Sequence, residues 1–210
     1  MEKVDILTPP TFEKSGITKP IKQAWDDENW IGTFNLWILQ SKPTPAIVYQ
    51  VRSLKSSWAP GKLDVTAGGH YSAGEELFDG LREVEEELGK KYKKEELTYL
   101  DRKMHVSPDV NGKMRQNIVD ISFILDNSPL STYVLEEAEV YAISSLPIAE
   151  LIKVHTKPGY QFQARALAVG GSTIKLNVQK DSFPFNWDNY HFKIALLADR
   201  FLKGEKNLIY

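Results

Sequence analysis

The stretch from Gly68 to Gly89 constrains the fold most, because it joins a glycine-rich loop to a short and very acidic helix. Apolar residues recur in it at spacings of four, three and four: Leu77, Leu81, Val84 and Leu88. These spacings predict one apolar stripe along an α-helix. Glycine is favoured just past a helix C-terminus, so we expect this helix to end at Gly89.

Three glutamates of this helix, Glu83, Glu86 and Glu87, fall on a common face turned away from the apolar stripe. Like charges three or four residues apart destabilise a bare helix by about 0.2–0.5 kcal/mol per pair. A divalent cation would remove this repulsion, since magnesium takes carboxylate, phosphate and water oxygens as ligands. An acidic run alone usually marks a solvated face. The preceding glycines favour a ligand site, because they let the backbone approach a bound group.

The stretch resembles the Nudix box, whose pattern is Gly-x5-Glu-x7-Arg-Glu-U-x-Glu-Glu-x-Gly-U, with U a bulky apolar residue. Gly69 and Glu75 match the first two positions, and the run from Arg82 to Gly89 matches the second half without a gap. Two departures stand out: six residues separate Glu75 from Arg82 where the pattern has seven, and Lys90 occupies the last apolar position. The shortening lies where the loop meets the helix, so it affects Glu75 and leaves the metal-binding half intact.

The resemblance implies the α/β class and a Nudix-type α/β/α sandwich with a mixed β-sheet. Strands that precede and follow one central helix also favour a mixed sheet with helices on both faces. We expect three segments: an N-terminal arm at 1–29, the Nudix domain at 30–155, and a C-terminal helical extension at 156–210 packed on the same domain.

The arm is expected to be irregular, because Pro9, Pro10 and Pro20 break regular structure, with a short edge strand near residues 4–7. Apolar and β-branched runs predict the later strands at 30–40, 46–52, 63–67, 96–107, 116–125, 140–144 and 172–178. Asn111-Gly112 is expected as a hairpin turn. Helices are expected at 146–154 and 187–203, residues 159–171 fit neither pattern, and 183–186 is expected as a loop.

The resemblance also implies hydrolysis of a diphosphate linked to another moiety, with Mg²⁺ or Mn²⁺ as cofactor. By matched position Glu83, Glu86 and Glu87 would bind the metal, with the backbone carbonyl of Gly68 as a further ligand. Arg82 would hold Glu86 in place through an i, i+4 pair. The general base would come from the box or from a later loop, where the candidates are Glu136, Glu137 and Glu139.

The loop also resembles one branch of the family, which includes isopentenyl-diphosphate isomerase and hydrolases similar to it. The residues that carry this likeness are Lys55, Trp58-Ala59-Pro60-Gly61, Asp64, Gly69-His70 and Ala73-Gly74-Glu75. The isomerases have a catalytic cysteine just before Gly-His, whereas this chain has Gly68 there and no cysteine at all. They also use N-terminal histidines as metal ligands, and no histidine precedes His70 here.

Three functions therefore remain. The favoured one is a metal-dependent Nudix hydrolase acting on a nucleoside diphosphate derivative or a related organic diphosphate, with Arg52, Lys55 and His70 as candidate substrate-binding residues. A non-hydrolytic module that binds a nucleotide or metabolite as a regulator is the alternative. It is favoured by the shortened loop and Lys90, and disfavoured by the three retained glutamates. The isomerase is the least favoured, because its cysteine is missing.

The composition limits the kinds of partner that we expect this chain to bind. A net charge of −2 over 210 residues gives no general attraction to nucleic acid or membrane surfaces. The sequence has no apolar run of about 18 residues, which a transmembrane helix needs, and the N-terminus lacks the features of a signal peptide. The absence of cysteine fits a reducing compartment. We expect a cytoplasmic protein whose partner is a small-molecule diphosphate, with the arm and the extension as candidate elements of a homodimer interface.

Overall fold

The computed structural model describes residues 2–109, 112–184 and 187–210. Its strands are β1 (Lys3–Thr8), β2 (Glu13–Pro20), β3 (Trp30–Gln40), β4 (Ala46–Arg52), β5 (Leu63–Asp64), β6 (Ala67–His70), β7 (Thr98–Pro108), β8 (Met114–Leu125), β9 (Val140–Pro147), β10 (Phe162–Ala168) and β11 (Thr173–Val178). Its α-helices are α1 (Ile21–Asp26), α2 (Leu81–Leu88), α3 (Ile148–Thr156) and α4 (Tyr190–Leu202).

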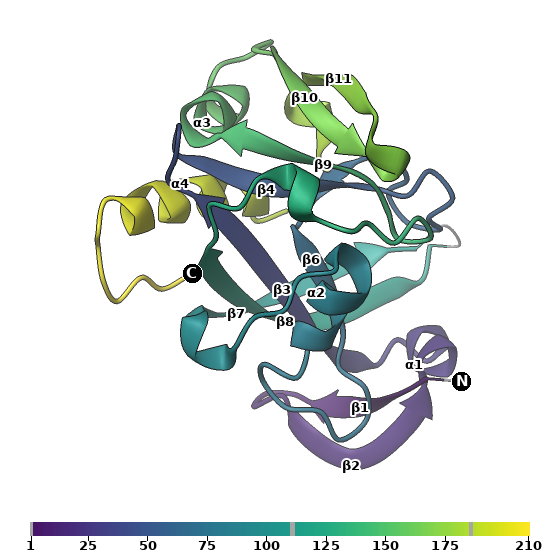
Figure 1. The fold of residues 1–210 in the computed structure, drawn as a ribbon. Coiled ribbons are helices and arrows are strands. Elements are labelled where there is room, and N and C mark those ends of the chain that lie inside the picture. Colours follow the sequence, from purple (N-terminus) through teal and green to yellow (C-terminus); the bar gives the residue numbers. More distant parts are fainter. Residues whose placement is uncertain (1, 110–111, 185–186) are drawn as a thin grey trace.

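All of these strands belong to one mixed sheet, and β3 is its centre (Figure 1). β3 pairs antiparallel with β1, β4 and β6 and parallel with β8. The parallel pair is the long one, running from Trp30 opposite Gln116 to Leu39 opposite Leu125. Because β3 makes all four of these pairings, it fixes where the loop before α2 meets the rest of the sheet.

The two faces of the sheet carry different cores because successive side chains of a strand point to opposite faces. Phe34, Leu36 and Ile38 of β3 are buried in a core that includes Val84 and Leu88 of α2. Trp37 and Leu39 are buried on the other face, in a core with Leu151 of α3 and Ile194 of α4. Helices thus cover both faces, and the expected α/β/α sandwich with a mixed sheet is confirmed.

Most of the expected elements are also confirmed. β7 and β8 form the expected hairpin, although Asn111 of its turn lies outside the described residues, as do residues 185 and 186 of the expected loop at 183–186. β4 pairs with β3 at Leu39 and Gln40 and then continues along β9. α3 and α4 occupy the positions expected for the last two helices.

The N-terminal segment is not irregular, so that expectation is wrong. β1 pairs with both β2 and β3, which places β1 inside the sheet and β2 at its edge. Its buried side chains form a small core with α1 and β3: Val4, Ile6, Ala24 and Ile31. The prolines lie at element boundaries, with Pro9 and Pro10 between the strands and Pro20 directly before α1. Proline is tolerated at such positions, because no ladder hydrogen bond is lost there.

The C-terminal segment contains a hairpin as well as the expected helix. β10 pairs with β9 and with β11, so the sheet continues through residues that fitted no pattern. The side chains of β10 that reach the core alternate along the strand: Phe162, Ala164, Ala166 and Ala168. Alanine is a weak strand former, which is why the alternation is hard to detect in the sequence. The division of the chain at residues 29 and 155 stays a prediction.

Candidate active site

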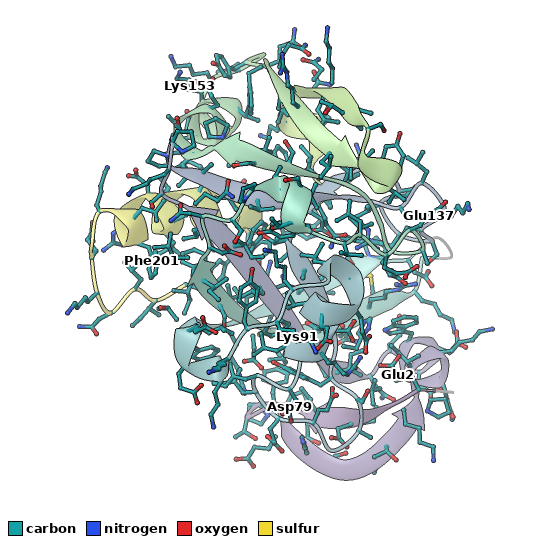
Figure 2. All side chains as sticks on the ribbon, in the orientation of Figure 1. Glu2, Asp79, Lys91, Glu137, Lys153 and Phe201 are labelled. Atoms are coloured by element: carbon teal, nitrogen blue, oxygen red, sulfur yellow. The ribbon has the colours of Figure 1, made fainter. Side chains whose placement is uncertain are left out.

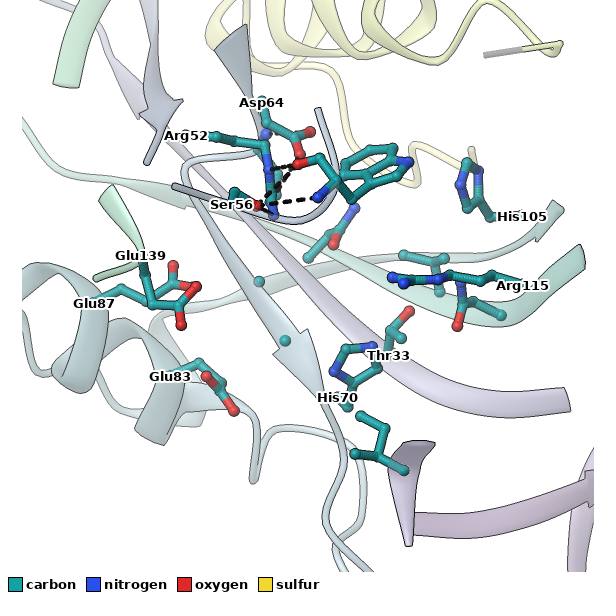
Figure 3. Close-up of a pocket in the computed structure, with 18 of the residues that line it drawn as sticks. Thr33, Arg52, Ser56, Asp64, His70, Glu83, Glu87, His105, Arg115 and Glu139 are labelled. Carbon is teal, nitrogen blue, oxygen red and sulfur yellow. Dashed lines mark hydrogen bonds and ion pairs between the residues drawn. The ribbon is translucent and has the colours of Figure 1, made fainter. Parts of the chain in front are cut away.

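A cleft of about 1070 Å³ opens over the sheet beside α2. Its walls come from β3, β6, β7 and β8, from α2, and from the loops after β4 and before β9. Figure 3 shows acidic side chains at one end and Arg115 and His105 at the other, with Thr33 and His70 between them. The residues predicted from the sequence to bind metal or substrate, and Arg82, all line this cleft: Arg52, Lys55, Gly68, His70, Arg82, Glu83, Glu86 and Glu87.

α2 begins one turn later than its apolar stripe predicts, at Leu81 instead of Leu77. Phe78 has a φ of 78°, which a continuing right-handed helix does not allow. The start of α2 then packs tightly on the sheet, since a β carbon on Gly80 would lie 2.6 Å from the side chain of Phe34. Glycine at position 80 therefore lets the acidic helix approach β3.

The end of α2 explains one departure from the motif. Gly89 ends the helix with a φ of 64°, as expected. The Lys90 amine lies 4.4 Å from the ring centroid of Tyr133 and 3.6 Å from Oδ2 of Asp126. Its aliphatic stem covers apolar surface while its amine reaches an acidic partner. Lysine thus replaces the apolar residue of the motif without leaving a buried charge unpaired.

The double glycine of β6 lets the Glu83 side chain of α2 and the backbone of β3 lie close to the strand. β6 pairs with β3, with Gly68 opposite Asn35 and Gly69 opposite Phe34. A β carbon on Gly69 would lie 2.5 Å from Cδ of Glu83, and one on Gly68 would lie 2.7 Å from the Phe34 carbonyl oxygen. Both distances are well below van der Waals contact, so any other residue would displace its neighbour.

Arg82 links three carboxylates of the loop and α2, and its Nη2 also lies 3.8 Å from Oε1 of Glu2. Its Nε donates to Oε1 of Glu75 at 2.8 Å, and its Nη1 lies 2.8 Å from Oε1 of Glu83 and 3.3 Å from Oε2 of Glu86. Glu75 also accepts a hydrogen bond from the backbone N–H of Ser72 at 2.6 Å. Despite the shortened spacing, Glu75 is thus held at the loop beside the helix. Hydrogen bonding to Glu75 and the nearby charges of Glu83 and Glu86 raise the pKa of Arg82.

Glu87 is the most enclosed carboxylate of the cleft, with 7% of its surface exposed. Its Oε2 is buried and has no hydrogen-bond partner among the described residues. Burial raises the pKa of Glu87 well above its ordinary value, and the charges of Glu83 and Glu139 add to this effect. A backbone hydrogen bond from Gly68 acts in the opposite direction. Burial likewise raises the pKa of Glu83.

This donor set fits a hard divalent cation. A buried carboxylate oxygen without a partner, next to two further carboxylates, is costly unless a positive charge compensates it. Magnesium and manganese prefer such oxygen ligands. Within the part of the chain that the structure describes, no three acidic or histidine side chains are gathered tightly enough to coordinate an ion as they stand. Arg82 holds Glu83 and Glu86 in ion pairs instead.

The three candidates for the general base, all from the loop before β9, differ in whether they line the cleft. Glu136 and Glu139 line the cleft. Glu137 is exposed and is not among the residues that line it, and it lies on the outer surface in Figure 2. Figure 3 places Glu139 beside Glu87. Glu137 therefore lies outside the cleft, whereas Glu136 and Glu139 are part of its wall.

Arg52 and Lys55 differ in how they are held. Arg52 donates from Nε to the carbonyl oxygen of Trp58 at 3.0 Å and from Nη2 to Oγ of Ser56 at 2.8 Å. Its Nη1 lies 3.4 Å from Oδ2 of Asp64. These contacts fix the guanidinium against the loop after β4. Lys55, by contrast, is exposed at the rim of the cleft.

His70 lies in the middle of the cleft wall, opposite Thr33 in the β6–β3 pair. Its ring meets that of Trp25 from α1 edge-on, with centroids 5.3 Å apart. Burial, followed by the guanidinium groups of Arg115 and Arg52, lowers the pKa of His70 to about 4. The ring is therefore neutral at pH 7 and offers one hydrogen-bond donor and one acceptor.

Sequence reasoning missed five polar residues of β7 and β8 that line the cleft: Lys103, His105, Ser107, Arg115 and Asn117. Lys103 is buried, with its amine 3.2 Å from Oδ2 of Asp188 and 3.8 Å from the ring centroid of Tyr190. The available signal was the spacing, because polar residues two apart in a strand share one face. That signal does not tell which face covers a cleft.

Two curated proteins are similar to this chain. It is 33% identical over 154 residues to Nudix hydrolase 3 from Arabidopsis thaliana, a match that covers 71% of this chain and 20% of that protein. It is 26% identical over 190 residues to an uncharacterized Nudix hydrolase from Clostridium acetobutylicum, covering 86% of this chain and 90% of that protein. No protein-family model matches the chain.

The fold has a solved counterpart. The structure of a MutT/nudix family protein from Enterococcus faecalis has a TM-score of 0.52 at 14% identity and covers 85% of this chain and 65% of that one. The chain thus has the Nudix fold. Together with the two sequence matches, this supports its place in the Nudix hydrolase family. Among the described residues, no helix is both long and apolar enough to cross a membrane.

Proposed function

We propose that this chain is a metal-dependent hydrolase that cleaves a diphosphate linkage in a nucleoside diphosphate derivative or a related organic diphosphate. One observation carries the proposal: Glu87 keeps a buried, unpartnered carboxylate oxygen in a cleft that it shares with Glu83, beside the close-packed Gly68 and Gly69. A cation bound there removes the electrostatic cost of this arrangement and attracts an anionic diphosphate.

Glu83, Glu86 and Glu87, with the carbonyl oxygen of Gly68, would hold the cation. Bound Mg²⁺ or Mn²⁺ would screen the charge of the diphosphate and make a nearby water more acidic. Arg82 orients Glu83 and Glu86, and its own charge limits their repulsion. These roles agree with the matched positions of the sequence motif.

The remaining steps fall to groups at the walls of the cleft. Glu139 is our candidate for the base that takes the proton of the attacking water, because it lines the cleft next to Glu87. Lys55, exposed at the rim, would bind a phosphate oxygen. Arg52 contributes its charge from a fixed position, since its hydrogen bonds to Ser56 and Trp58 hold it against the loop. His70 would contact the substrate as a neutral hydrogen-bonding group.

The second candidate function is a nucleotide- or metabolite-binding regulator without turnover. One observation favours it: Arg82 engages the carboxylates in ion pairs, and in the described part of the chain no three of these groups form a ready ion site. A cation must therefore draw Glu83 or Glu86 away from Arg82 before it binds. If it does not, the cleft binds ligands without cleaving them.

Phosphate release tests the proposal. Purified protein is incubated with Mg²⁺ or Mn²⁺ and a panel of nucleotide sugars, dinucleotides, nucleoside triphosphates and isoprenoid diphosphates, and a phosphatase converts products to phosphate. We expect metal-dependent turnover of at least one compound, and a loss of about a hundredfold or more in Glu87→Gln. Glu85→Gln is the matched control, since Glu85 lies on the same helix and pairs with Lys91 outside the cleft. Binding without turnover of any compound would favour the regulator.

Four further expectations stay predictions. They are a place in the branch similar to the isopentenyl-diphosphate isomerases, a cytoplasmic location, a homodimer, and no binding to nucleic acid. Product analysis with isopentenyl diphosphate tests the first, since an isomerase returns an isomer and a hydrolase returns phosphate. Sedimentation of the purified protein tests the third.

A further inference from the structure

We propose that the end of the cleft between α1 and β8 binds a second anionic group, carried by the part of the substrate beyond the diphosphate, and that Arg115 selects for it. The inference rests on the proposed function, because it assumes that the diphosphate lies at the acidic end. The anion is a phosphate ester or a carboxylate, since both match the planar fork of a guanidinium.

The floor of this end is polar where a sheet face next to a core is usually apolar. β7 and β8 pair so that Lys103, His105 and Ser107 lie opposite Val119, Asn117 and Arg115. All six residues line the cleft. Since residues two apart share one face of a strand, the floor is built from alternate positions of both strands. Five of the six side chains are polar, so this surface suits a polar ligand.

Arg115 carries a positive charge that the protein leaves uncompensated. Its Nε is buried and has no hydrogen-bond partner, and no carboxylate lies within 4.0 Å of its guanidinium in the described ranges. The guanidinium stacks on Trp25 of α1, with Cζ 4.2 Å from the ring centroid. By contrast, Arg52 pairs with Asp64 at 3.4 Å. Arg115 is half-buried, so its unpaired guanidinium is open to the cleft and can bind an anionic ligand group through charge-assisted hydrogen bonds.

Two neighbours of Arg115 also leave hydrogen-bonding groups free for a ligand. Trp25 Nε1 and Asn117 Oδ1 are buried without partners among the residues that the structure describes. Asn117 follows Arg115 on the same face of β8, about 6.6 Å further along the strand. The indole N–H and the amide can bind the sugar or base that carries the anion, next to the neutral ring of His70.

The two ends of the cleft therefore have opposite character (Figure 3). Glu83, Glu87 and Glu139 make one end acidic, which repels an anion unless a cation is bound there. Arg115 makes the other end attractive to an anion in the absence of any metal. A purely apolar moiety such as an isoprenoid chain is disfavoured, because it would leave the buried polar atoms of Arg115 and Asn117 unpaired.

Calorimetric titration of the metal-free protein tests this inference with matched ligand pairs. NADP⁺ and NAD⁺ differ by one 2′-phosphate, coenzyme A and dephospho-coenzyme A by one 3′-phosphate, and UDP-glucuronate and UDP-glucose by one carboxylate. Repulsion between the diphosphate and the acidic end is common to both members of a pair, so it cancels in the ratio of their dissociation constants. The first two pairs report a phosphate and the third a carboxylate.

We expect the more anionic member of at least one pair to bind about 10-fold to 100-fold more tightly. In Arg115→Gln the two dissociation constants of that pair should become equal, while the dissociation constant of the weaker ligand stays unchanged. Arg115→Lys should keep part of the difference. Lys113→Gln is the matched control, because Lys113 lies just before β8 and pairs with Asp26 outside the cleft. Thermal melting of each variant confirms that it is folded.

Equal affinities within all three pairs would overturn the inference. The inference would also be overturned if Arg115→Gln lowered the affinity for both members of a pair by the same factor. Arg115 would then support the site without contacting the second anion. Failure of the proposed function is a separate result: no phosphate release from any substrate, with the ratios retained, removes the hydrolase and leaves the selective subsite. Conversely, phosphate release with equal affinities within every ligand pair supports the hydrolase and removes the selective subsite.

Discussion

A β carbon at position 69 would lie 2.5 Å from Cδ of Glu83, so the strand and the carboxylate fit together only because Gly69 has no side chain. Gly69 belongs to β6 and Glu83 to α2, and the shortened loop of the motif runs between them. The contact shows how the two halves of the motif depend on each other. The glycine half makes the space that the glutamate half occupies.

Gly69→Ala should therefore reduce activity far more than stability. The added methyl group pushes the Glu83 carboxylate away from the cleft, and a displacement of about 1 Å costs about a hundredfold in kcat/KM. Urea unfolding should change little, because the side chain of Glu83 can rotate toward solvent. Gly32→Ala is a suitable control, since its β carbon would crowd Tyr71 at 3.0 Å and no carboxylate. Equal activity losses in both variants would contradict the role given to Gly69.

Removal of Arg82 should weaken metal binding. Arg82 holds Glu75, Glu83 and Glu86 in place, and loss of such an orienting partner typically costs about 10-fold to 100-fold in metal affinity or activity. We expect Arg82→Ala to raise the Mg²⁺ concentration needed for half-maximal activity by this factor. Arg82→Lys should resemble it, because lysine lacks the planar fork that reaches several carboxylates.

The control for Arg82 is Lys91→Ala, since Lys91 pairs with Glu85 on the outer side of α2 at 2.7 Å. It should leave the Mg²⁺ dependence unchanged. If Arg82→Ala binds Mg²⁺ more tightly than the wild type, Arg82 competes with the metal for the carboxylates. That result would favour the second candidate function, a regulator that binds ligands without cleaving them.

The parts of the fold that the sequence predicts are those that local patterns determine. The apolar stripe and Gly89 locate α2, and the run of apolar and β-branched residues at 30–40 locates the central strand. Residues 162–168 were missed because alanine carries little strand signal. The N-terminal hairpin was missed because Pro9, Pro10 and Pro20 suggest irregular chain, whereas they lie between elements.

The candidate site also has one part that local sequence patterns predict and one part that they do not. Its acidic end comes from one continuous stretch, so the motif predicts it. Its polar floor needs the pairing of Lys103, His105, Arg115 and Asn117 across β7 and β8, together with Trp25 from α1. That arrangement depends on contacts between residues far apart in the sequence. A single sequence gives strand faces but not which elements cover them.

The buried charge of Glu87 should make the metal-free protein less stable at neutral pH. Because the folded-state pKa of Glu87 is raised, the unfolded chain releases this proton first as pH rises above the ordinary value of 4.5. Wild-type stability thus falls above that pH, and Glu87→Gln should avoid the loss. We expect the variant to gain stability over wild type between pH 5 and pH 8 in urea unfolding with a chelator present.

Mg²⁺ provides the complementary measurement on Glu87. A ligand at about 100 times its dissociation constant stabilises a protein by about 2.7 kcal/mol, and Glu87→Gln should lose most of this gain. Glu85 is exposed, so Glu85→Gln is the control. It should change the free energy of unfolding by no more than about 0.5 kcal/mol at pH 5 and at pH 8. A Glu87→Gln variant less stable than wild type at pH 8 without metal would show that the carboxylate is compensated within the protein.

His191 should make the fold sensitive to mild acid. It is buried among Trp37, Tyr49 and Phe183, and neither ring nitrogen has a hydrogen-bond partner among the described residues. Burial, with the nearby His155 and Lys103, lowers the pKa of His191 from 6.5 to about 3.

The unfolded chain therefore takes up this proton first as pH falls below 6.5, so wild-type stability should drop by about 2 kcal/mol between pH 7 and pH 5 through His191 alone. His191→Phe keeps an aromatic ring in the core and removes the proton site. We expect it to flatten the dependence of the unfolding free energy on pH by this amount, whatever its effect at pH 7. Lys193→Gln, on the exposed side of α4, should leave the slope unchanged. An unaltered slope in His191→Phe would mean that His191 titrates equally in the folded and unfolded chains.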